Sequence, residues 1–447
     1  MRLKYIEEKE YNLLDKIKVK VKIKENPYDI PQEKLFKMAA RINPKRSFLF
    51  ISKILGKHIP VNPYISLLGG MSLAARYLEE VYDICLPEMK DIIYSLKTGE
   101  NAEKNYKKIK RNLFKLPEKT LFIGFAETAT ALGHSVFASF EGNGYYIHTT
   151  REIIDDFDNI IKFEEEHSHA TSHRVYPLDF SFFKSNCPIV FVDDEITTGK
   201  TILNIIKSIH KDYPRKNYYV VTILDWRSDE DKKRFKSIED MLGVNIKVIS
   251  LISGNIEIIG QPIKSVERKE ENQIDNIEKT EVEYIYLDSY FDEIYRYNDE
   301  SYLKWTGRFG ITLDLQRKID NKIEEAGLFL RNICNGKKIL CMGTEEFMYI
   351  PMMISAYIGE DVYYQSTTRS PIYPYDESEY GAKNAFSFVS PNNEKLKNYF
   401  YNAPYRYYDE IFLFLERYIE KDKLNSILKQ LKRLGVRKIF VVMCTRN

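Results

Sequence analysis

The sequence has little cysteine and no paired-cysteine motif. It contains five cysteines in 447 residues, and no two of them are spaced as C-x-x-C. An odd number of cysteines without that spacing argues against a disulfide framework and against a zinc knuckle. We therefore expect free thiols in a reducing cytoplasm.

Long apolar runs and an excess of charge of one sign are also missing. No stretch approaches the roughly 20 apolar residues that a membrane span requires, and the first eight residues lack the apolar core of a signal peptide. The net charge is only +2, so charge alone indicates neither a nucleic-acid nor a membrane partner. The length and the 44% hydrophobic content are typical of a globular protein of about two or three domains.

The residues with the clearest chemistry lie between positions 188 and 203. An apolar run over 189–192 predicts a buried strand, and isoleucines at 202, 205, 206 and 209 predict an amphipathic helix. Between strand and helix the chain places three carboxylates and a loop of small and hydroxyl residues, namely Asp193, Asp194, Glu195, Thr197, Thr198, Gly199, Lys200 and Thr201. Backbone N–H groups at a helix start suit a phosphate, and adjacent carboxylates suit ribose hydroxyls. Strand-end capping is the alternative role for the two aspartates. We expect a sugar-phosphate site.

Gly199-Lys200-Thr201 resembles the end of a nucleotide-binding P-loop, but the spacing excludes that motif. The pattern G-x-x-x-x-G-K-[ST] requires its first glycine where this chain has Asp194. A carboxylate at that point would repel the phosphates.

Three further segments carry candidate site residues. A predicted strand at 121–124 precedes small residues that permit close approach of a ligand, Ala126, Glu127, Thr128, Ala129 and Thr130. A second predicted strand ends at Arg151. The basic stretch 41–60 is either an edge strand with solvated lysines or a source of cations for a polyphosphate, with Arg46, Lys53 and Lys57 as candidates.

The polar segment 163–174 contains three of the seven histidines, His167, His169 and His173, followed by Arg174. A metal site, a solvated loop and a mobile catalytic loop are the three interpretations. The third is favoured because the neighbouring segments suit a charged substrate.

Strands that alternate with helices predict an α/β fold with a parallel sheet. Strands are expected at 218–224, 244–250 and 256–259, and helices at 65–81 and 87–98. The charged, apolar-poor stretch 264–283 predicts a linker. The predicted organisation is an N-terminal extension (1–40), a first domain (41–263), that linker, and a second domain (284–447).

The second domain repeats the pattern of the first. The strand at 121–124 returns at 340–343, Glu127 returns as Glu346, and the segment ending Thr149-Thr150-Arg151 returns as Thr367-Thr368-Arg369. The chemistry does not repeat, because Asp193 becomes Leu415 and Thr198 becomes Glu420 at an offset of 222. We expect a degenerate second copy, either purely structural or with an anion site at Arg308, Arg369 and the hydroxyls of 366–368.

Residues 190–201 closely resemble the phosphoribosyl pyrophosphate (PRPP) signature of type I phosphoribosyltransferases, and the resemblance extends over about 41–260. The segments N-P-K-R-S-F at 43–48, E-E-H-S-H-A at 165–170 and T-G-R-F-G at 306–310 resemble a narrower family. Its members are phosphoribosyltransferases with a C-terminal TRSP domain, of tellurite-resistance-type gene neighbourhoods. The resemblance implies the type I phosphoribosyltransferase fold, a parallel sheet flanked by helices with a hood, followed by a degenerate phosphoribosyltransferase-like α/β domain.

The resemblance also implies roles. Residues 197–201 would hold the 5′-phosphate, while Asp193 and Asp194 would hold the ribose hydroxyls and favour the positive charge that develops at C1′. Mg²⁺ would be held mainly through PRPP. The amides of 126–130, Arg151 and the basic candidates would stabilise pyrophosphate, and one of the three histidines would move a proton. The implied activity is transfer of a phosphoribosyl group to an unidentified small acceptor. A homo-oligomer is compatible with the fold, and a PRPP-sensing regulator without turnover is the alternative.

Overall fold

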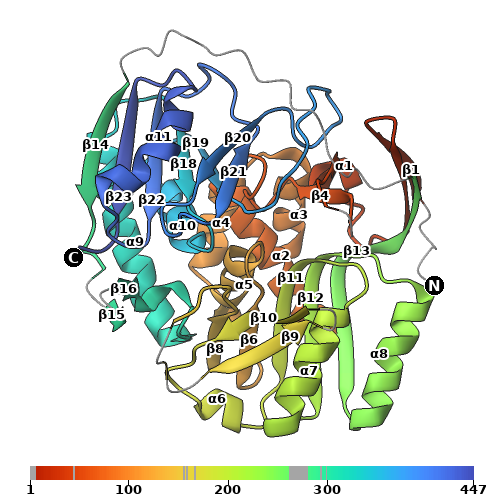
Figure 1. The fold of residues 1–447 in the computed structure, drawn as a ribbon. Coiled ribbons are helices and arrows are strands. Elements are labelled where there is room, and N and C mark those ends of the chain that lie inside the picture. Colours follow the sequence, from red (N-terminus) through yellow and green to blue (C-terminus); the bar gives the residue numbers. More distant parts are fainter. Residues whose placement is uncertain are drawn as a thin grey trace.

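The computed structural model of the chain describes residues 7–43, 46–154, 157, 160–165, 168–260, 280–291, 294–297 and 300–446, with the backbone alone considered for 163–172. Two sheets organise these residues, and the second lies above and to the left of the first in Figure 1. All five cysteines are free, as predicted. None of the helices in the described ranges is long and apolar enough to cross a membrane.

The first sheet has eight strands. Their order across the sheet is β1 (Glu7–Leu13), β2 (Ile17–Glu25), β13 (Asn245–Gly260), β12 (Asn217–Asp225), β11 (Ile189–Ile196), β6 (Thr120–Gly124), β8 (Gly144–His148) and β17 (Ile311–Thr312). The five strands from β13 to β8 are parallel to one another. β2 on one side and β17 on the other run antiparallel to them, and the edge strand β1 pairs antiparallel with β2. Helices cover this sheet, among them α2 (Pro63–Tyr82), α5 (Thr130–Phe137), α7 (Lys200–Asp212) and α8 (Asp229–Leu242).

The second sheet has five strands, all parallel. Their order is β14 (Glu281–Tyr286), β23 (Lys438–Met443), β22 (Glu410–Leu415), β18 (Lys338–Gly343) and β19 (Asp361–Ser366). Its helices are α9 (Leu313–Ile333), α10 (Tyr349–Ile358) and α11 (Asn425–Lys432). The run β23-β22-β18-β19 has the same order and direction as β12-β11-β6-β8 in the first sheet.

The register of the two sheets also corresponds. Leu121 pairs with Ile189 on one side and with Tyr145 on the other. Leu340 pairs in the same way with Ile411 and Tyr363. Residues that correspond in the sequence repeat therefore occupy equivalent positions in the two sheets.

The remaining elements are short connections and hairpins around these sheets. They are α1 (Gln32–Leu35), β3 (Phe36–Ala40), β4 (Phe48–Ser52), α3 (Met89–Thr98), α4 (Ala102–Lys110), β5 (Phe114–Lys115), β7 (Phe140–Glu141), β9 (Ile161–Glu165), β10 (Ser168–Val175), α6 (Ser181–Lys184), β15 (Ile294–Tyr297), β16 (Glu300–Leu303), β20 (Ala385–Val389), β21 (Lys397–Tyr401), and the 3₁₀ turns η1 (Lys304–Thr306) and η2 (Lys421–Leu424).

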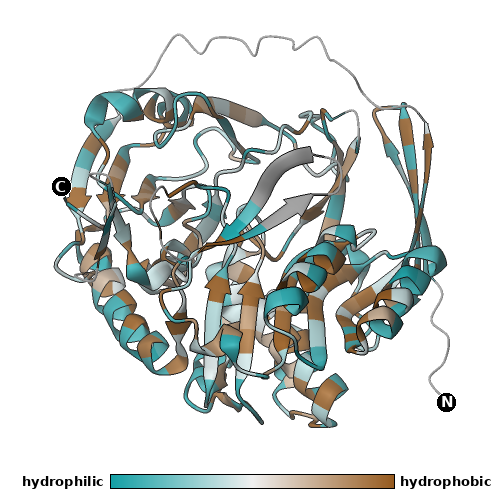
Figure 2. Ribbon diagram, turned by 60° about the horizontal axis from the view of Figure 1, so that its bottom comes forward, coloured by the Kyte–Doolittle hydropathy of each residue, from teal (hydrophilic) through white to brown (hydrophobic). Residues whose placement is uncertain are grey.

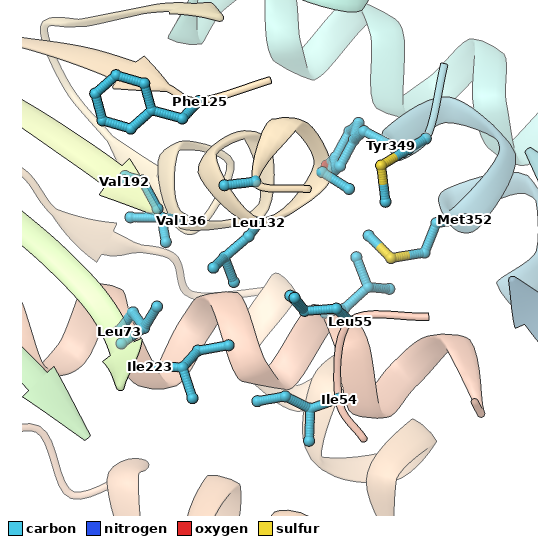
Figure 3. Close-up of a cluster of buried hydrophobic side chains, with 14 of the residues drawn as sticks. Ile54, Leu55, Leu73, Phe125, Leu132, Val136, Val192, Ile223, Tyr349 and Met352 are labelled. Atoms are coloured by element: carbon cyan, nitrogen blue, oxygen red, sulfur yellow. The ribbon is translucent and has the colours of Figure 1, made fainter. Parts of the chain in front are cut away.

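One apolar core continues from the first sheet into the second. Figure 3 shows Leu132 and Val136 of α5 among side chains of both parts, with Tyr349 and Met352 of α10 on one side. The ring of Tyr349 stacks on His134 with a centroid separation of 3.6 Å. Figure 2 shows apolar brown bands in the strands and mixed faces on the surrounding helices. Because α5 and α10 pack directly, the two sheets are held in a fixed relation around the loops that follow β6 and β18.

Two sequence predictions of secondary structure are wrong. The strands expected at 244–250 and 256–259 form one strand, β13, which pairs with β12 along its first part and with β2 along its second. Gly254, within β13, permits the close approach of β2, since a Cβ would lie 2.1 Å from the carbonyl oxygen of Lys22. The polar segment 163–174 forms the antiparallel pair β9 and β10, rather than a loop without regular structure.

The domain limits stay predictions, although the strands cross them. Residues 7–25, placed in an N-terminal extension, form the hairpin at the edge of the first sheet. β14 begins at Glu281, within the predicted linker, and β17 joins the first sheet from the second half of the chain. Most of the linker, residues 264–279, lies outside the described residues, as do residues 261–263 of the predicted first domain.

Candidate functional site

A cavity of about 370 Å³ lies at the carboxyl ends of β6, β8 and β11. Parallel strands point their carboxyl ends to one edge of a sheet, where ligands of open α/β folds commonly bind. The cavity wall includes predicted site residues from five segments, namely Arg46, Ala126, Glu127, Thr128, Arg151, His173, Asp193, Asp194, Glu195, Thr197, Thr198, Gly199, Lys200 and Thr201. Segments far apart in the sequence therefore meet at one place.

The three acids lie on β11 itself, because this strand continues to Ile196, four residues beyond the predicted end. Asp193 Oδ1 accepts a hydrogen bond from the Asp194 N–H at 2.9 Å. Glu195 forms an ion pair with Arg46, whose guanidinium lies 4.8 Å from the Phe48 ring centre. Burial and the neighbouring carboxylates raise the pKa of both Asp193 and Asp194. Such a pair favours a cation or a hydroxyl-rich ligand that relieves the repulsion.

The loop 197–199 turns the chain from β11 into α7, and Gly199 makes that turn possible. Its φ of 68° is in the left-handed region, and a Cβ there would lie 2.4 Å from the Phe235 ring. Both facts exclude other residues without rearrangement. The turn leaves the first N–H groups of α7 at the cavity, where they and the helix dipole suit a phosphate.

The loop after β6 is fixed by side chains from the neighbouring strand end. The Ala126 N–H donates to Thr149 Oγ1 at 2.9 Å, and Thr149 Oγ1 lies 3.0 Å from His173 Nδ1. Burial lowers the pKa of His173 to about 4, so this imidazole is neutral near pH 7. His173 is thus linked to the loop through Thr149.

Several predicted site residues lie away from the cavity wall. Thr130 Oγ1 donates to the carbonyl oxygens of Glu127 and Glu346, and Lys53 Nζ donates to the carbonyl oxygen of Glu33. Ala129, Lys57 and Arg174 are also absent from the described wall. His167 lies outside the described residues, and His169 belongs to β10 by its backbone alone.

Lys57 is a buried structural cation rather than a wall residue. Its side chain is 1% exposed, and Nζ lies 2.5 Å from Glu127 Oε1, whose side chain is 7% exposed. Nζ also donates to the carbonyl oxygen of Glu345 in the second half of the chain, at 3.2 Å. Burial alone would raise the pKa of Glu127, but the charge and hydrogen bond of Lys57, together with the charges of Arg151 and Arg369, outweigh it and the pKa is lowered. Lys57 therefore joins the loop after β6 to the second sheet.

The cavity wall also contains polar residues that sequence reasoning did not assign to this site. They are Arg41, His58, Thr368, Arg369 and Ser370. The last three follow β19 of the second sheet, so both halves of the chain build the cavity. The repeat of T-T-R at 149–151 and 367–369 was a signal for Arg369, but it did not reveal that the two arginines share one cavity.

The corresponding position in the second sheet is closed by ion pairs. Arg308, 3% exposed, lies 2.6 Å from Glu416 and 3.5 Å from Glu152, and Arg417 lies 2.7 Å from Glu152. The space left there is about 20 Å³. Because Arg308 is buried beside so small a space, the structure favours the purely structural alternative over an anion site at Arg308. Arg369, the other arginine expected there, also lines the first cavity.

In the described part of the chain, no group of three or more His, Cys, Asp or Glu side chains is arranged to hold a metal ion. The residues at the end of β11 nevertheless fit a divalent cation shared with a ligand. Asp193 and Asp194 repel each other there, and Glu195 Oε2 is buried without a hydrogen-bond partner among described residues. Mg²⁺ commonly takes one or two carboxylates together with ligand phosphates.

The fold and this cavity define an α/β protein with a site suited to a phosphorylated sugar. Comparison with protein families identifies a phosphoribosyl transferase domain at residues 35–255, and a TRSP domain, described as C-terminal to that domain, at residues 305–431. The chain belongs to the family of phosphoribosyltransferases with a C-terminal TRSP domain.

Similar solved structures include adenine phosphoribosyltransferase from Trypanosoma brucei in complex with AMP, pyrophosphate and ribose-5-phosphate. It is 15% identical, covers 54% of this chain and 86% of its own, and has a TM-score of 0.29. Orotate phosphoribosyltransferase from Mycobacterium tuberculosis in complex with PRPP is 10% identical, covers 41% and 87%, and has a TM-score of 0.19. No curated protein matches the chain. The family assignment rests on the two family models.

Proposed function

We propose that the chain transfers the phosphoribosyl group of PRPP to a nitrogen nucleophile of a small acceptor. The C1′–O bond to pyrophosphate breaks, the C1′–N bond forms, and the acceptor proton passes to the departing pyrophosphate. Family membership supports the reaction class. The observation that carries the proposal is one cavity that contains the Asp193–Asp194 pair, the loop at the start of α7, and Arg151.

Each group has a role that follows from its chemistry. The N–H groups of 198–201 and the hydroxyls of Thr197, Thr198 and Thr201 suit the 5′-phosphate. Asp193 and Asp194 suit the ribose hydroxyls, and their charge favours an oxocarbenium-like C1′. Arg151 and the amides of 126–128 suit the negative charge that grows on pyrophosphate. Mg²⁺, held mainly through PRPP, would supply further charge neutralisation.

His173 is better suited to positioning than to proton transfer. Its pKa of about 4 makes it a weak base near neutral pH. Its contact with Thr149 instead holds the Ala126 N–H and so fixes the loop that would meet pyrophosphate. We therefore assign the proton of the acceptor to pyrophosphate.

We further propose that the first half has the type I phosphoribosyltransferase fold and that the second half is a degenerate copy of it. The shared order and register of four strands support a common origin. The ion pairs of Arg308 and Arg417 support the loss of the second site. A tellurite-linked pathway and a cytoplasmic location stay predictions.

Calorimetry with PRPP and Mg²⁺ tests the proposal. The wild type should bind, the D193N/D194N variant should bind at least 100-fold more weakly, and D240N, a matched change on the exposed surface of α8, should bind like the wild type. Absence of binding by the wild type, or full binding by D193N/D194N, would overturn the assignment.

A regulator that binds PRPP without turnover is the second candidate. Pyrophosphate release across a panel of bases and small amines separates the two. Release that depends on both PRPP and one acceptor supports the transferase, whereas tight PRPP binding without release for any acceptor supports the regulator.

A further inference from the structure

The two arginines that end equivalent strands line the same cavity. Arg151 follows β8 of the first sheet, and Arg369 follows β19 of the second. The Arg369 Nη2 lies 3.0 Å from Glu345, and its Nε lies 3.9 Å from Glu127 across the junction of the two halves. The guanidinium is thus oriented by carboxylates from both halves, and its side chain remains 24% exposed.

Two other polar side chains of this wall belong to the same junction. The backbone of Arg41 forms a bridge with Ile372, and the carbonyl oxygen of His58 accepts from Asn402 Nδ2. Contacts with the second half of the chain therefore position Arg41 and His58 as well as Arg369. We call these three residues the junction wall.

The junction wall contains polar atoms without partners. His58 is 5% exposed, yet its Nε2 has no hydrogen-bond partner among the described residues. The Nε atoms of Arg41 and Arg369 are also buried and have no hydrogen-bond partner among the described residues. Buried polar atoms in folded proteins are nearly always hydrogen-bonded, so three without such a bond at one wall indicate a ligand that pairs them.

The charge of the junction wall points to the ligand. Burial, followed by the charges of Arg46 and Arg151, lowers the pKa of Arg41. His58 is neutral near pH 7, because burial lowers its pKa to about 3. Two guanidinium groups and a neutral imidazole match the two oxygens of a carboxylate, which accepts about four hydrogen bonds.

We propose that the junction wall is the acceptor subsite and that it binds a carboxylate on the acceptor. This proposal rests on the proposed function and gives its acceptor a chemical class. It also gives the second half of the chain a role, since Arg369 comes from there. The pyrophosphate of PRPP is the other source of negative charge, and the experiment separates the two.

The test measures binding of three acid and neutral pairs to the full chain saturated with magnesium pyrophosphate, by ligand-observed NMR. The pairs are nicotinate and nicotinamide, benzoate and benzamide, and orotate and uracil. Because pyrophosphate already fills its own positions, binding of an acid reports a separate subsite. At least one acid should bind tenfold or more tightly than its neutral partner.

Variants assign the subsite. R369Q should weaken acid binding at least tenfold and leave PRPP affinity within twofold of the wild type, and R369K should be intermediate because lysine lacks the guanidinium fork. R317Q, a matched change at a half-exposed arginine of α9, should bind acids like the wild type. Thermal melting of each variant verifies folding, and R41Q repeats the test if R369Q is unfolded.

Three results would overturn the acceptor proposal while leaving the proposed function intact. They are PRPP binding without acid preference in any pair, loss of acid binding once pyrophosphate is present, and an equal loss of PRPP and acid affinity in R369Q. Failure of the wild type to bind PRPP would instead overturn the proposed function.

Discussion

Removal of the Lys57 ammonium should destabilise the protein through the carboxylate that it leaves behind. The K57M variant keeps most of the side-chain volume but leaves Glu127 buried at 7% exposure. Loss of one partner of a buried ion pair typically costs about 3–5 kcal/mol. Arg369, at 3.9 Å, compensates part of the Glu127 charge, so we expect the lower end, about 3 kcal/mol.

A double-mutant cycle isolates this pair. K57M/E127Q removes both charges and should recover at least about 1.5 kcal/mol relative to the sum of the single variants. Urea unfolding followed by circular dichroism and by the fluorescence of the two tryptophans, Trp226 and Trp305, measures the free energies. The matched control is K107M, whose pair with Glu103 is half-exposed on both sides and should change stability by less than about 1 kcal/mol.

Two results would refute this reasoning. One is a K57M variant that loses no more stability than K107M. The other is a double variant whose loss equals the sum of the two single losses, since additivity would mean that Lys57 and Glu127 do not interact.

Three further predictions concern other parts of the molecule. Burial lowers the pKa of His58, His134 and His148 to about 3 and that of His173 to about 4. Below pH 6.5 the unfolded chain therefore binds more protons than the folded protein. The free energy of unfolding should fall as the pH drops from 6.5 towards 4, by up to about 1.4 kcal/mol per pH unit for each histidine. Urea midpoints between pH 7.5 and 5 check this, with a smaller slope expected in H134Q and a flat wild-type profile as the contrary result. G199A should lose more than about 2 kcal/mol of unfolding free energy and weaken PRPP binding, because its Cβ would overlap the Phe235 ring. The control G99A, with a φ of 82° and open space around its Cβ, should lose only about 1 kcal/mol. Equal shifts of the melting temperature in the two variants would contradict the packing argument. R308M should lose about 3–5 kcal/mol, because it removes the closest ion-pair partner of the buried Glu416, whereas Glu152 keeps Arg417. R317M should lose less than about 1 kcal/mol, and equal unfolding free energies for the two variants would mean that the second pocket is not held by ion pairs.

The local sequence pattern was sufficient to predict the structure where a strand, the loop after it and the next helix are formed by adjacent residues. The apolar run at 189–192, the acids after it and the isoleucine spacing of α7 all come from adjacent residues, and the structure places them as a strand, a turn and a helix. The repeat was readable for the same reason, because the core positions of four strands recur with a nearly constant offset.

Features that depend on docking of the two sheets were not readable. In the sequence, Lys57 is one of several lysines that could bind a polyphosphate. In the structure it is buried, and its ammonium contacts the carbonyl oxygen of Glu345 and the Glu127 carboxylate. Arg369 was assigned to the second copy, and contacts between the two halves, among them α5 with α10 and β19 with Val61, bring it to the first cavity. Two strands were expected at 244–250 and 256–259, whereas the close approach of β2 at Gly254 lies within one continuous strand.

A crystal structure of the full chain with PRPP and Mg²⁺ tests the central claim most directly. We expect the 5′-phosphate on the N–H groups and hydroxyls of 197–201, the ribose hydroxyls on Asp193 and Asp194, and pyrophosphate beside Arg151 and the loop 126–128. PRPP bound elsewhere, or bound with its phosphate away from the start of α7, would contradict the account.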